Sequence, residues 1–234
     1  MDHKIYVLDF FGSKKLRGMG LNVPINRFLT AYRTNLYNSF LGYYIEEDNV
    51  NNLNQSDVRE YVNKYEEKKN QGILWGKDIK HFDGKIEIIK LIAKKTLLLS
   101  TSSDKMIFDN SNVIWLGHQN KKEWLHLLSQ SKFLIGLGDP LLGPSAIDAI
   151  SNGCMYINPI YEKSRKVNDQ IFLSQHSYAV NYIGEPYVCS YKINDITSLQ
   201  DCIDKALKTN LKPFVPEDFT KDAYRQRVIH IFNL

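Results

Sequence analysis

The stretch "KFLIGLGDPLLGPSAIDAISNGCMYINP", residues 132–159, contains the clearest structural pattern of the chain. It begins with an apolar run without polar alternation, passes through a loop rich in glycine and proline, continues with a short segment of helical period and ends in a second apolar run. Such apolar runs are typical of strands that are buried on both faces of a parallel sheet. The stretch therefore predicts a strand, loop, helix and strand that form one unit of an α/β domain.

The same alternation runs from residue 71 to the C-terminus. Strands are predicted at residues 72–76, 96–100, 112–117, 132–138, 154–158, 179–184 and 187–193. Helices are predicted at residues 84–95, 121–131, 145–152, 196–209 and 221–232. In the helix at 121–131, the spacing places Trp124, Leu127 and Leu128 on the buried face. Because doubly buried strands need helices on both sides of their sheet, the pattern predicts a Rossmann-like, doubly wound α/β fold over residues 71–234.

Residues 1–70 lack this repeat. Strands are predicted at 4–12 and 40–47, polar connectors at 12–20 and 49–58, and a surface helix at 59–71. We expect this part to be a lead-in segment that packs on the edge of the α/β domain.

The composition is that of a soluble globular protein. The chain has 234 residues, of which 43% are hydrophobic and 24% charged, and a formal net charge of +4. Its lysines are spread along the chain, which favours a solvated surface over a nucleic-acid interface. The first residues do not have the pattern of a secretory signal, and no apolar run is long enough for a membrane span.

Three cysteines, Cys154, Cys189 and Cys202, are an odd number, so at least one lacks a partner within the chain. Cys154 falls at a helix-to-strand junction and Cys202 on a helix face. We expect buried thiols here rather than a disulfide framework.

The loop at 137–143 should lie at the carboxyl edge of the sheet, where Rossmann-like domains bind ligands. Gly136, Gly138 and Gly143 would allow close approach of the backbone and positive φ angles. Pro144 suits the first position of the helix that follows. The N–H groups and the dipole at a helix start favour an anion, typically a phosphate.

Two charged residues near this loop each allow two interpretations. Asp148 could accept hydrogen bonds from ribose hydroxyls, or it could close a capping box with Ser145 and bind no ligand. Lys77 follows the strand at 72–76 and could meet a diphosphate, or it could be a solvated surface lysine. His176 could lie near the cleft or pack within its own loop.

Several kinds of site lack their sequence signature. The six histidines show no metal-ligand spacing, and none of the common phosphate-loop, dinucleotide, serine-hydrolase or zinc-protease motifs occurs. No Asp-x-Asp occurs either, so the carboxylate clamp for a metal-bound diphosphate is absent from the sequence. We therefore expect neither a metal nor a cofactor.

Several ordered segments resemble glycosyltransferase family 18, the α-1,6-mannosylglycoprotein 6-β-N-acetylglucosaminyltransferases. The stretch 133–159 has the family's Gly-Leu-Gly-x-Pro turn, its Gly-Pro, its carboxylate-Ala-Ile and its Asn-Gly-Cys in this order. "SQHSYAVNYIGEPYV" (174–188) and "LKPFVPEDFT" (211–220) follow in register. "VLDFFG" (7–12), "NSFLGYYIEE" (38–47) and "WGK" (75–77) extend the resemblance over nearly the whole chain.

The resemblance implies the C-terminal, donor-binding half of a GT-B fold. The family transfers N-acetylglucosamine from UDP-GlcNAc to the 6-hydroxyl of an α-mannose in an N-glycan, with inversion and without a metal. Asp148 stands where the family has a glutamate that faces the nucleotide. The donor is expected to be bound by Lys77, Gly138, Pro140, Gly143, Pro144, Ser145 and Asp148.

No catalytic residue is assigned, because the family's general base belongs to a preceding domain that has no counterpart in this sequence. An N-glycan acceptor would be a partner only if such a domain is supplied. The resemblance places the protein in the Golgi, whereas a chain complete as given would be cytoplasmic. The alternative function is a non-catalytic module that binds a UDP-sugar or a protein.

Overall fold

The protein is described by a computed structural model, which covers residues 5–13, 23–46, 68–105 and 111–233. It divides into two compact units. The larger unit comprises Asp48–Glu162 and Ser174–Phe214, and the smaller unit comprises Met1–Glu47, Lys163–Leu173 and Val215–Leu234. The division at residue 70 that the sequence suggests remains a prediction, and the last helix of the chain groups with the smaller unit.

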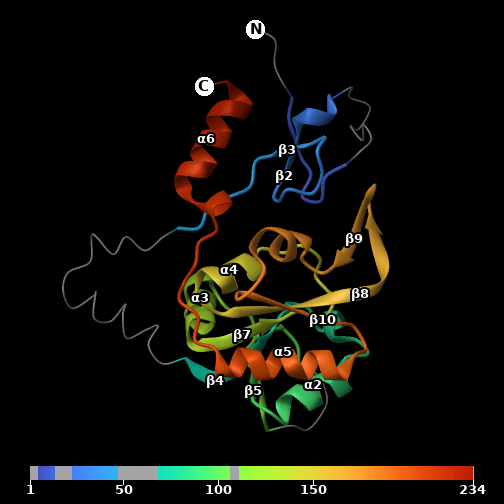
Figure 1. The fold of residues 1–234 in the computed structure, drawn as a ribbon, viewed down its shortest axis with the longest axis vertical. Coiled ribbons are helices and arrows are strands. Elements are labelled where there is room, and N and C mark those ends of the chain that lie inside the picture. The colour runs from blue at the N-terminus through green and yellow to red at the C-terminus, as the bar shows by residue number, and fades with distance from the viewer. Residues whose placement is uncertain (1–4, 14–22, 47–67, 106–110, 234) are drawn as a thin grey trace, which may run out of the picture. The chain divides into compact units, whose positions relative to one another are not determined.

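A parallel sheet forms the centre of the larger unit (Figure 1). Its strands are β4 (Lys69–Leu74), β5 (Leu97–Ser100), β6 (Val113–Trp115), β7 (Ser131–Ile135), β8 (Met155–Val167) and β10 (Val188–Lys192). They are ordered β10-β8-β7-β4-β5-β6, and β9 (Gln170–Ser174) pairs with β8 outside this path. The end of β8 and most of β9 fall within Lys163–Leu173, which is grouped with the smaller unit. Numbered by their position in the chain, the six parallel strands have the Rossmann order 3-2-1-4-5-6 when the sheet is followed from β6. The predicted fold class is confirmed.

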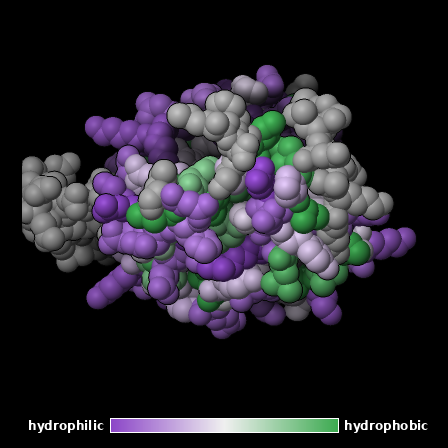
Figure 2. Space-filling model, turned by 90° about the horizontal axis from the view of Figure 1, so that it is seen from above, coloured by the Kyte–Doolittle hydropathy of each residue, from purple (hydrophilic) through white to green (hydrophobic). Residues whose placement is uncertain are grey.

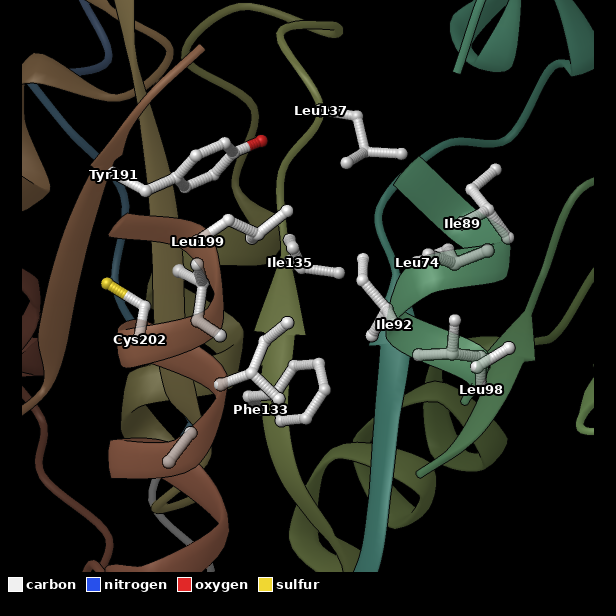
Figure 3. Packing of buried hydrophobic residues seen from close by; sticks show 14 of the residues in the cluster. Leu74, Ile89, Ile92, Leu98, Phe133, Ile135, Leu137, Tyr191, Leu199 and Cys202 are labelled. Atoms are coloured by element: carbon white, nitrogen blue, oxygen red, sulfur yellow. The ribbon is translucent and has the colours of Figure 1, made fainter. Parts of the chain in front are cut away.

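Helices cover both faces of this sheet. They are α2 (Ile86–Ala93), α3 (Lys121–Gln130), α4 (Ser145–Ser151) and α5 (Ile196–Lys208). Neighbouring strand residues point to opposite faces, so Leu74 packs in the cluster that contains residues of α2 and α5, and Ile73 packs in the cluster of α3 and α4. Figure 3 shows the first cluster, in which side chains of α2 and α5 converge on β4, β5 and β7.

The run at 179–184 does not form the predicted strand. Residues Ala179–Ile183 form a single π-helical turn, and Gly184 ends it with a φ of 68°. A short apolar run fits a strand or a buried helical turn equally well by periodicity alone. The predicted helix at 59–71 lies mostly outside the described residues, and its last three residues belong to β4.

The cysteine prediction is wrong for two of the three residues. Cys189 of β10 and Cys202 of α5 form a disulfide, with Cα atoms 5.6 Å apart. Because α5 packs directly on β10, residues that are 13 positions apart in the sequence meet. Cys154 is a buried free thiol, as predicted.

The smaller unit contains a short parallel sheet in the order β1-β2-β3. Its elements are β1 (Val7–Leu8), β2 (Phe28–Thr30), β3 (Ser39–Phe40) and α6 (Lys221–Phe232). Of the described residues of the predicted strand at 40–47, only Phe40 lies in a strand, whereas the last helix has its predicted bounds. The rings of Tyr32 and Phe219 are fully buried and lie 5.8 Å apart, which joins the last part of the chain to this sheet.

The surface seen in Figure 2 is mainly hydrophilic, with separate hydrophobic areas. Within the described part of the chain, no helix has the length and apolar character that crossing a membrane requires.

Candidate functional site

The order of the strands locates the candidate site. From β4 the chain proceeds to β5 and β6 on one side, whereas β7 begins the half of the sheet that continues to β8 and β10 on the other side. Between β4 and β7 the direction of winding reverses, and in open α/β sheets ligands bind beyond the carboxyl ends of the strands at such a point. Lys77 follows β4, and the glycine loop of residues 136–144 follows β7. Both sequence-predicted segments therefore flank the reversal point.

Gln175 holds the glycine loop in place. Its Oε1 accepts a hydrogen bond from the Gly138 N–H at 2.9 Å, and its Nε2 donates one to the Pro140 carbonyl at 2.9 Å. Its own carbonyl accepts from the Leu142 N–H at 3.0 Å. One side chain thus satisfies polar groups on both sides of the cis peptide between Asp139 and Pro140.

The three glycines have two different roles. Gly138 has a φ of +110°, as predicted, whereas Gly136 and Gly143 do not have positive φ angles. At Gly136 an added Cβ would lie 2.1 Å from Oε1 of Gln175, and at Gly143 it would lie 2.7 Å from Cζ2 of Trp75. These two positions require glycine because protein side chains press against the backbone.

The start of α4 differs from the sequence prediction. Pro144 is the N-cap residue, and its carbonyl accepts from the N–H groups of Ile147 and Asp148, both at 3.0 Å. No side chain caps this end, so the capping box between Ser145 and Asp148 is not formed. Because Gln175 accepts hydrogen bonds from the N–H groups of Gly138 and Leu142, these two groups are not available to an anion.

Asp148 is a buried carboxylate that accepts a side-chain hydrogen bond from Trp124. Only 7% of the residue is exposed, and its Oδ2 accepts a hydrogen bond from Nε1 of Trp124 on α3 at 3.2 Å. Burial raises the pKa of Asp148, while Lys121, the Trp124 hydrogen bond and Lys77 act in the opposite direction. The structure therefore brings Lys77 and Asp148 within electrostatic reach of each other.

The remaining predicted residues lie along the same loop. Pro140 is half-buried and contributes its carbonyl to Gln175, Gly143 and Ser145 are half-buried, and Pro144 is exposed. Tyr161 and Tyr191, which sequence analysis did not select, donate from their hydroxyls to the carbonyls of Gly138 and Gly136.

His176 belongs to the scaffold beneath the loop. It is fully buried, its Nδ1 accepts from the Ala179 N–H at 3.1 Å, and its own N–H donates to Oδ1 of Asn158 at 3.0 Å. Burial lowers the pKa of His176 to about 3. Loop packing, one of the two interpretations of this residue, accounts for its position.

Sequence analysis missed Gln175, Trp124 as a polar partner, and Lys121. Gln175 directly precedes His176 in the segment at 174–188, but only the histidine has a side chain that the sequence marks as a candidate. Among the described residues, no group of three or more histidines, cysteines, aspartates or glutamates is placed to hold a metal ion.

The larger unit is thus a Rossmann-like domain with a glycine loop, a buried carboxylate and a lysine near the carboxyl edge of its sheet. The chain belongs to glycosyltransferase family 18, whose family model matches residues 4–233. Family membership and the strand order together identify the Rossmann-like half of a GT-B fold.

Curated relatives resemble almost the whole chain but are much longer. Alpha-1,6-mannosylglycoprotein 6-beta-N-acetylglucosaminyltransferase A of Homo sapiens is 30% identical over 221 residues, which cover 88% of this chain and 29% of the relative. The enzyme named alpha-1,6-mannosylglycoprotein 6-beta-N-acetylglucosaminyltransferase of Caenorhabditis elegans is 24% identical over 226 residues, covering 89% and 32% respectively. The chain thus spans about three-tenths of the length of these relatives.

Solved structures show weaker likenesses. A UDP-GlcNAc 2-epimerase of Methanocaldococcus jannaschii, in complex with UDP-GlcNAc and UDP, has a TM-score of 0.48 at 12% identity and covers 77% of this chain and 49% of its own. WaaG, a glycosyltransferase involved in lipopolysaccharide biosynthesis, has a TM-score of 0.45 at 16% identity and covers 89% of this chain and 52% of its own.

Proposed function

We propose that this chain is the donor-binding half of a metal-independent, inverting glycosyltransferase that uses UDP-GlcNAc. The acceptor would be the 6-hydroxyl of an α-mannose in an N-glycan, as the names of the relatives suggest. The observation that carries the proposal is the convergence of Lys77, the glycine loop and Asp148 at the reversal point between β4 and β7. Membership in family 18 supports the same conclusion.

Each predicted residue has a defined part in the proposed site. Lys77 is exposed beyond β4, where its ammonium can balance the charge of the diphosphate. Gly143 and Ser145 present backbone N–H groups near the start of α4. Asp148 accepts hydrogen bonds from ribose hydroxyls. Gly138, Pro140 and Pro144 shape the loop rather than contact the donor through side chains.

The proposed chemistry is direct displacement at the anomeric carbon. The mannose oxygen attacks, the bond to the UDP oxygen breaks, and negative charge develops on the departing diphosphate. The positive charge of Lys77 stabilises this developing charge more in the transition state than in the ground state. The general base that takes the proton of the hydroxyl is not assigned to any residue of this chain and must come from another part of the enzyme.

The disulfide supports the proposed compartment. Disulfides form and persist in oxidising compartments such as the secretory pathway, and they are rare in the cytosol. The bond between Cys189 and Cys202 therefore favours the Golgi over a cytoplasmic location for this protein.

Isothermal titration calorimetry with UDP and with UDP-GlcNAc, in EDTA, tests the donor site. We expect metal-independent binding in the micromolar to low-millimolar range. Lys77→Ala should weaken it roughly 10- to 100-fold, the effect of losing a charged hydrogen bond. Lys122→Ala is the matched control, because Lys122 is an exposed lysine on α3 and its loss changes the net charge equally.

Three results would count against the proposal. A folded protein that binds neither ligand would remove the donor site from consideration. Equal weakening by Lys77→Ala and Lys122→Ala would mean that binding depends on the overall positive charge and not on a defined diphosphate contact. Donor binding without transfer, when an acceptor-binding domain is supplied, would favour the non-catalytic alternative.

A further inference from the structure

We propose that Trp124 is a positioning residue, which holds one oxygen of the Asp148 carboxylate so that the other oxygen can accept a hydrogen bond from a ribose hydroxyl. This inference rests on the proposed function, because it concerns how the same nucleotide site is organised. It adds a residue of α3 to a site that otherwise consists of loops at the sheet edge and the start of α4.

The contact between the two residues is specific. Trp124 lies on α3 and Asp148 on α4, and the indole Nε1 donates to Oδ2 at 3.2 Å. The indole ring is half-buried and packs against the apolar cluster between these helices and the sheet, so its N–H has a fixed direction. Among the described residues, Asp148 Oδ1 has no hydrogen-bond donor, although Oδ2 has one.

A short carboxylate needs such a partner to present an oxygen reliably. The terminal torsion of aspartate is broad, so the carboxylate plane is not fixed by rotamer preference alone. A hydrogen bond from a rigid donor to Oδ2 selects one orientation of this plane. The remaining oxygen then faces a constant direction, which a ligand hydroxyl can use.

The same hydrogen bond helps to keep the carboxylate charged. Burial favours the protonated form of Asp148, whereas Lys121 of α3, the Trp124 hydrogen bond and Lys77 after β4 favour the ionised form. An ionised carboxylate is purely an acceptor, which suits a pair of ribose hydroxyls. Trp124 therefore both orients the Asp148 carboxylate and favours its ionised form.

The decisive variant is Trp124→Phe, which keeps an aromatic ring and removes the N–H. We expect it to weaken UDP binding about 3- to 10-fold, since a hydrogen bond to a charged group that lies beside the ligand is lost. Binding of 2′,3′-dideoxy-UDP should change less than about 2-fold, because this probe lacks the hydroxyls. Trp115→Phe, the same substitution on β6, is the matched control and should affect neither ligand.

A spectroscopic readout tests the contact without any ligand. The indole N–H resonance of Trp124 in ¹H–¹⁵N spectra should shift with pH as Asp148 ionises, and this shift should be absent in Asp148→Asn. In the Asp148→Asn background, Trp124→Phe should have no further effect on UDP binding, because the two residues act through one another.

The outcomes separate the two proposals. If UDP binds but Trp124→Phe weakens UDP and 2′,3′-dideoxy-UDP equally, or weakens neither, the positioning role is overturned and the donor site stands. An indole resonance that ignores the ionisation of Asp148 would also overturn it. If the folded wild-type protein binds no nucleotide, the proposed function fails, and the positioning role fails with it.

Discussion

Replacing Lys68 with methionine should destabilise the larger unit substantially. The ammonium of Lys68 lies within hydrogen-bond distance of four backbone carbonyls, those of Leu128 (3.2 Å), Ser129 (2.9 Å), Ser131 (3.1 Å) and Asn152 (3.0 Å), which share its three N–H groups. These carbonyls lie at the C-terminal ends of α3 and α4, where the last carbonyls of a helix have no partner within it. A cation there also interacts favourably with both helix dipoles. Lys68 thus ties together the ends of two helices.

The expected loss of stability follows from this geometry. Methionine fills a similar volume but donates no hydrogen bond. The Leu128 carbonyl keeps the Ser131 N–H as a partner, whereas each other carbonyl that is left unsatisfied costs roughly 1–3 kcal/mol. The variant no longer buries an ammonium, and this offsets part of the loss, since desolvation already lowers the pKa of Lys68. The net destabilisation should be about 3–5 kcal/mol, which is the cost of the unsatisfied carbonyls reduced by the desolvation that is recovered. At roughly 2–4 °C per kcal/mol, the melting temperature should fall by about 6–20 °C.

Urea unfolding followed by far-ultraviolet circular dichroism measures this loss. Lys69→Met is the matched control, because Lys69 is the adjacent residue and is exposed at the start of β4. The control should stay within about 0.5 kcal/mol of the wild type. Equal stabilities of Lys68→Met and Lys69→Met would refute the reasoning, since the four contacts would then contribute nothing net.

Three further predictions concern the disulfide, the glycine loop and the buried carboxylate. Urea unfolding of Cys189→Ala/Cys202→Ala should show a loss of about 3 kcal/mol, because the bond joins residues 13 positions apart and loops of about 15 residues have this effect. Gly136→Ala should cost about 1–3 kcal/mol in the same assay, because its Cβ would collide with Oε1 of Gln175. In thermal melts at several pH values, Asp148→Asn should be more stable than the wild type at neutral pH, and calorimetry should show UDP binding weakened at least about 10-fold.

Each of these predictions has a control and a contradicting outcome. Alkylation of the denatured, unreduced protein should label Cys154 alone, and labelling of all three cysteines would contradict the disulfide. Gly84→Ala places its Cβ in open space at a φ of +68° and therefore reports the cost of a positive φ without a collision. Gly136 has no positive φ, so an unchanged stability of Gly136→Ala would contradict the collision with Gln175. Asp83→Asn, at an exposed carboxylate, should leave both stability and UDP binding unchanged.

The sheet could be predicted because its strands carry a strong and simple signal. Residues 133–135 are apolar in succession, and in the structure they are all buried, with Phe133 and Ile135 on one face and Leu134 on the other. Such burial is possible only with helices on both faces of the sheet, so a run of successive apolar residues predicts this architecture. The positions of Lys77 and the glycine loop then followed from the strand ends.

The details that were missed depend on contacts that are distant in the sequence. Cys189 and Cys202 pair because α5 packs on β10, which spacing alone does not reveal. Gln175 serves a loop more than 30 residues before it, and a single glutamine carries no local signal of such a role. The Ser-x-x-Asp pattern at 145–148 was a misleading local signal, because Pro144 occupies the cap position and Asp148 turns to Trp124 instead.

The position of Asp148 itself argues for a function. Its pKa lies above the ordinary 3.8 mainly because of burial, so the folded protein loses stability as the pH rises from 3.8 through the folded-state pKa. The stability gain of Asp148→Asn should therefore be present at neutral pH and vanish below pH 3.8, where both forms are uncharged. The ionised carboxylate of Asp148 destabilises the fold, although the Trp124 hydrogen bond and the charges of Lys121 and Lys77 favour it. Ionised groups that lower the stability of the folded protein are typical of functional sites. A neutral-pH melting temperature of Asp148→Asn below that of the wild type would instead make the carboxylate a structural element of α4.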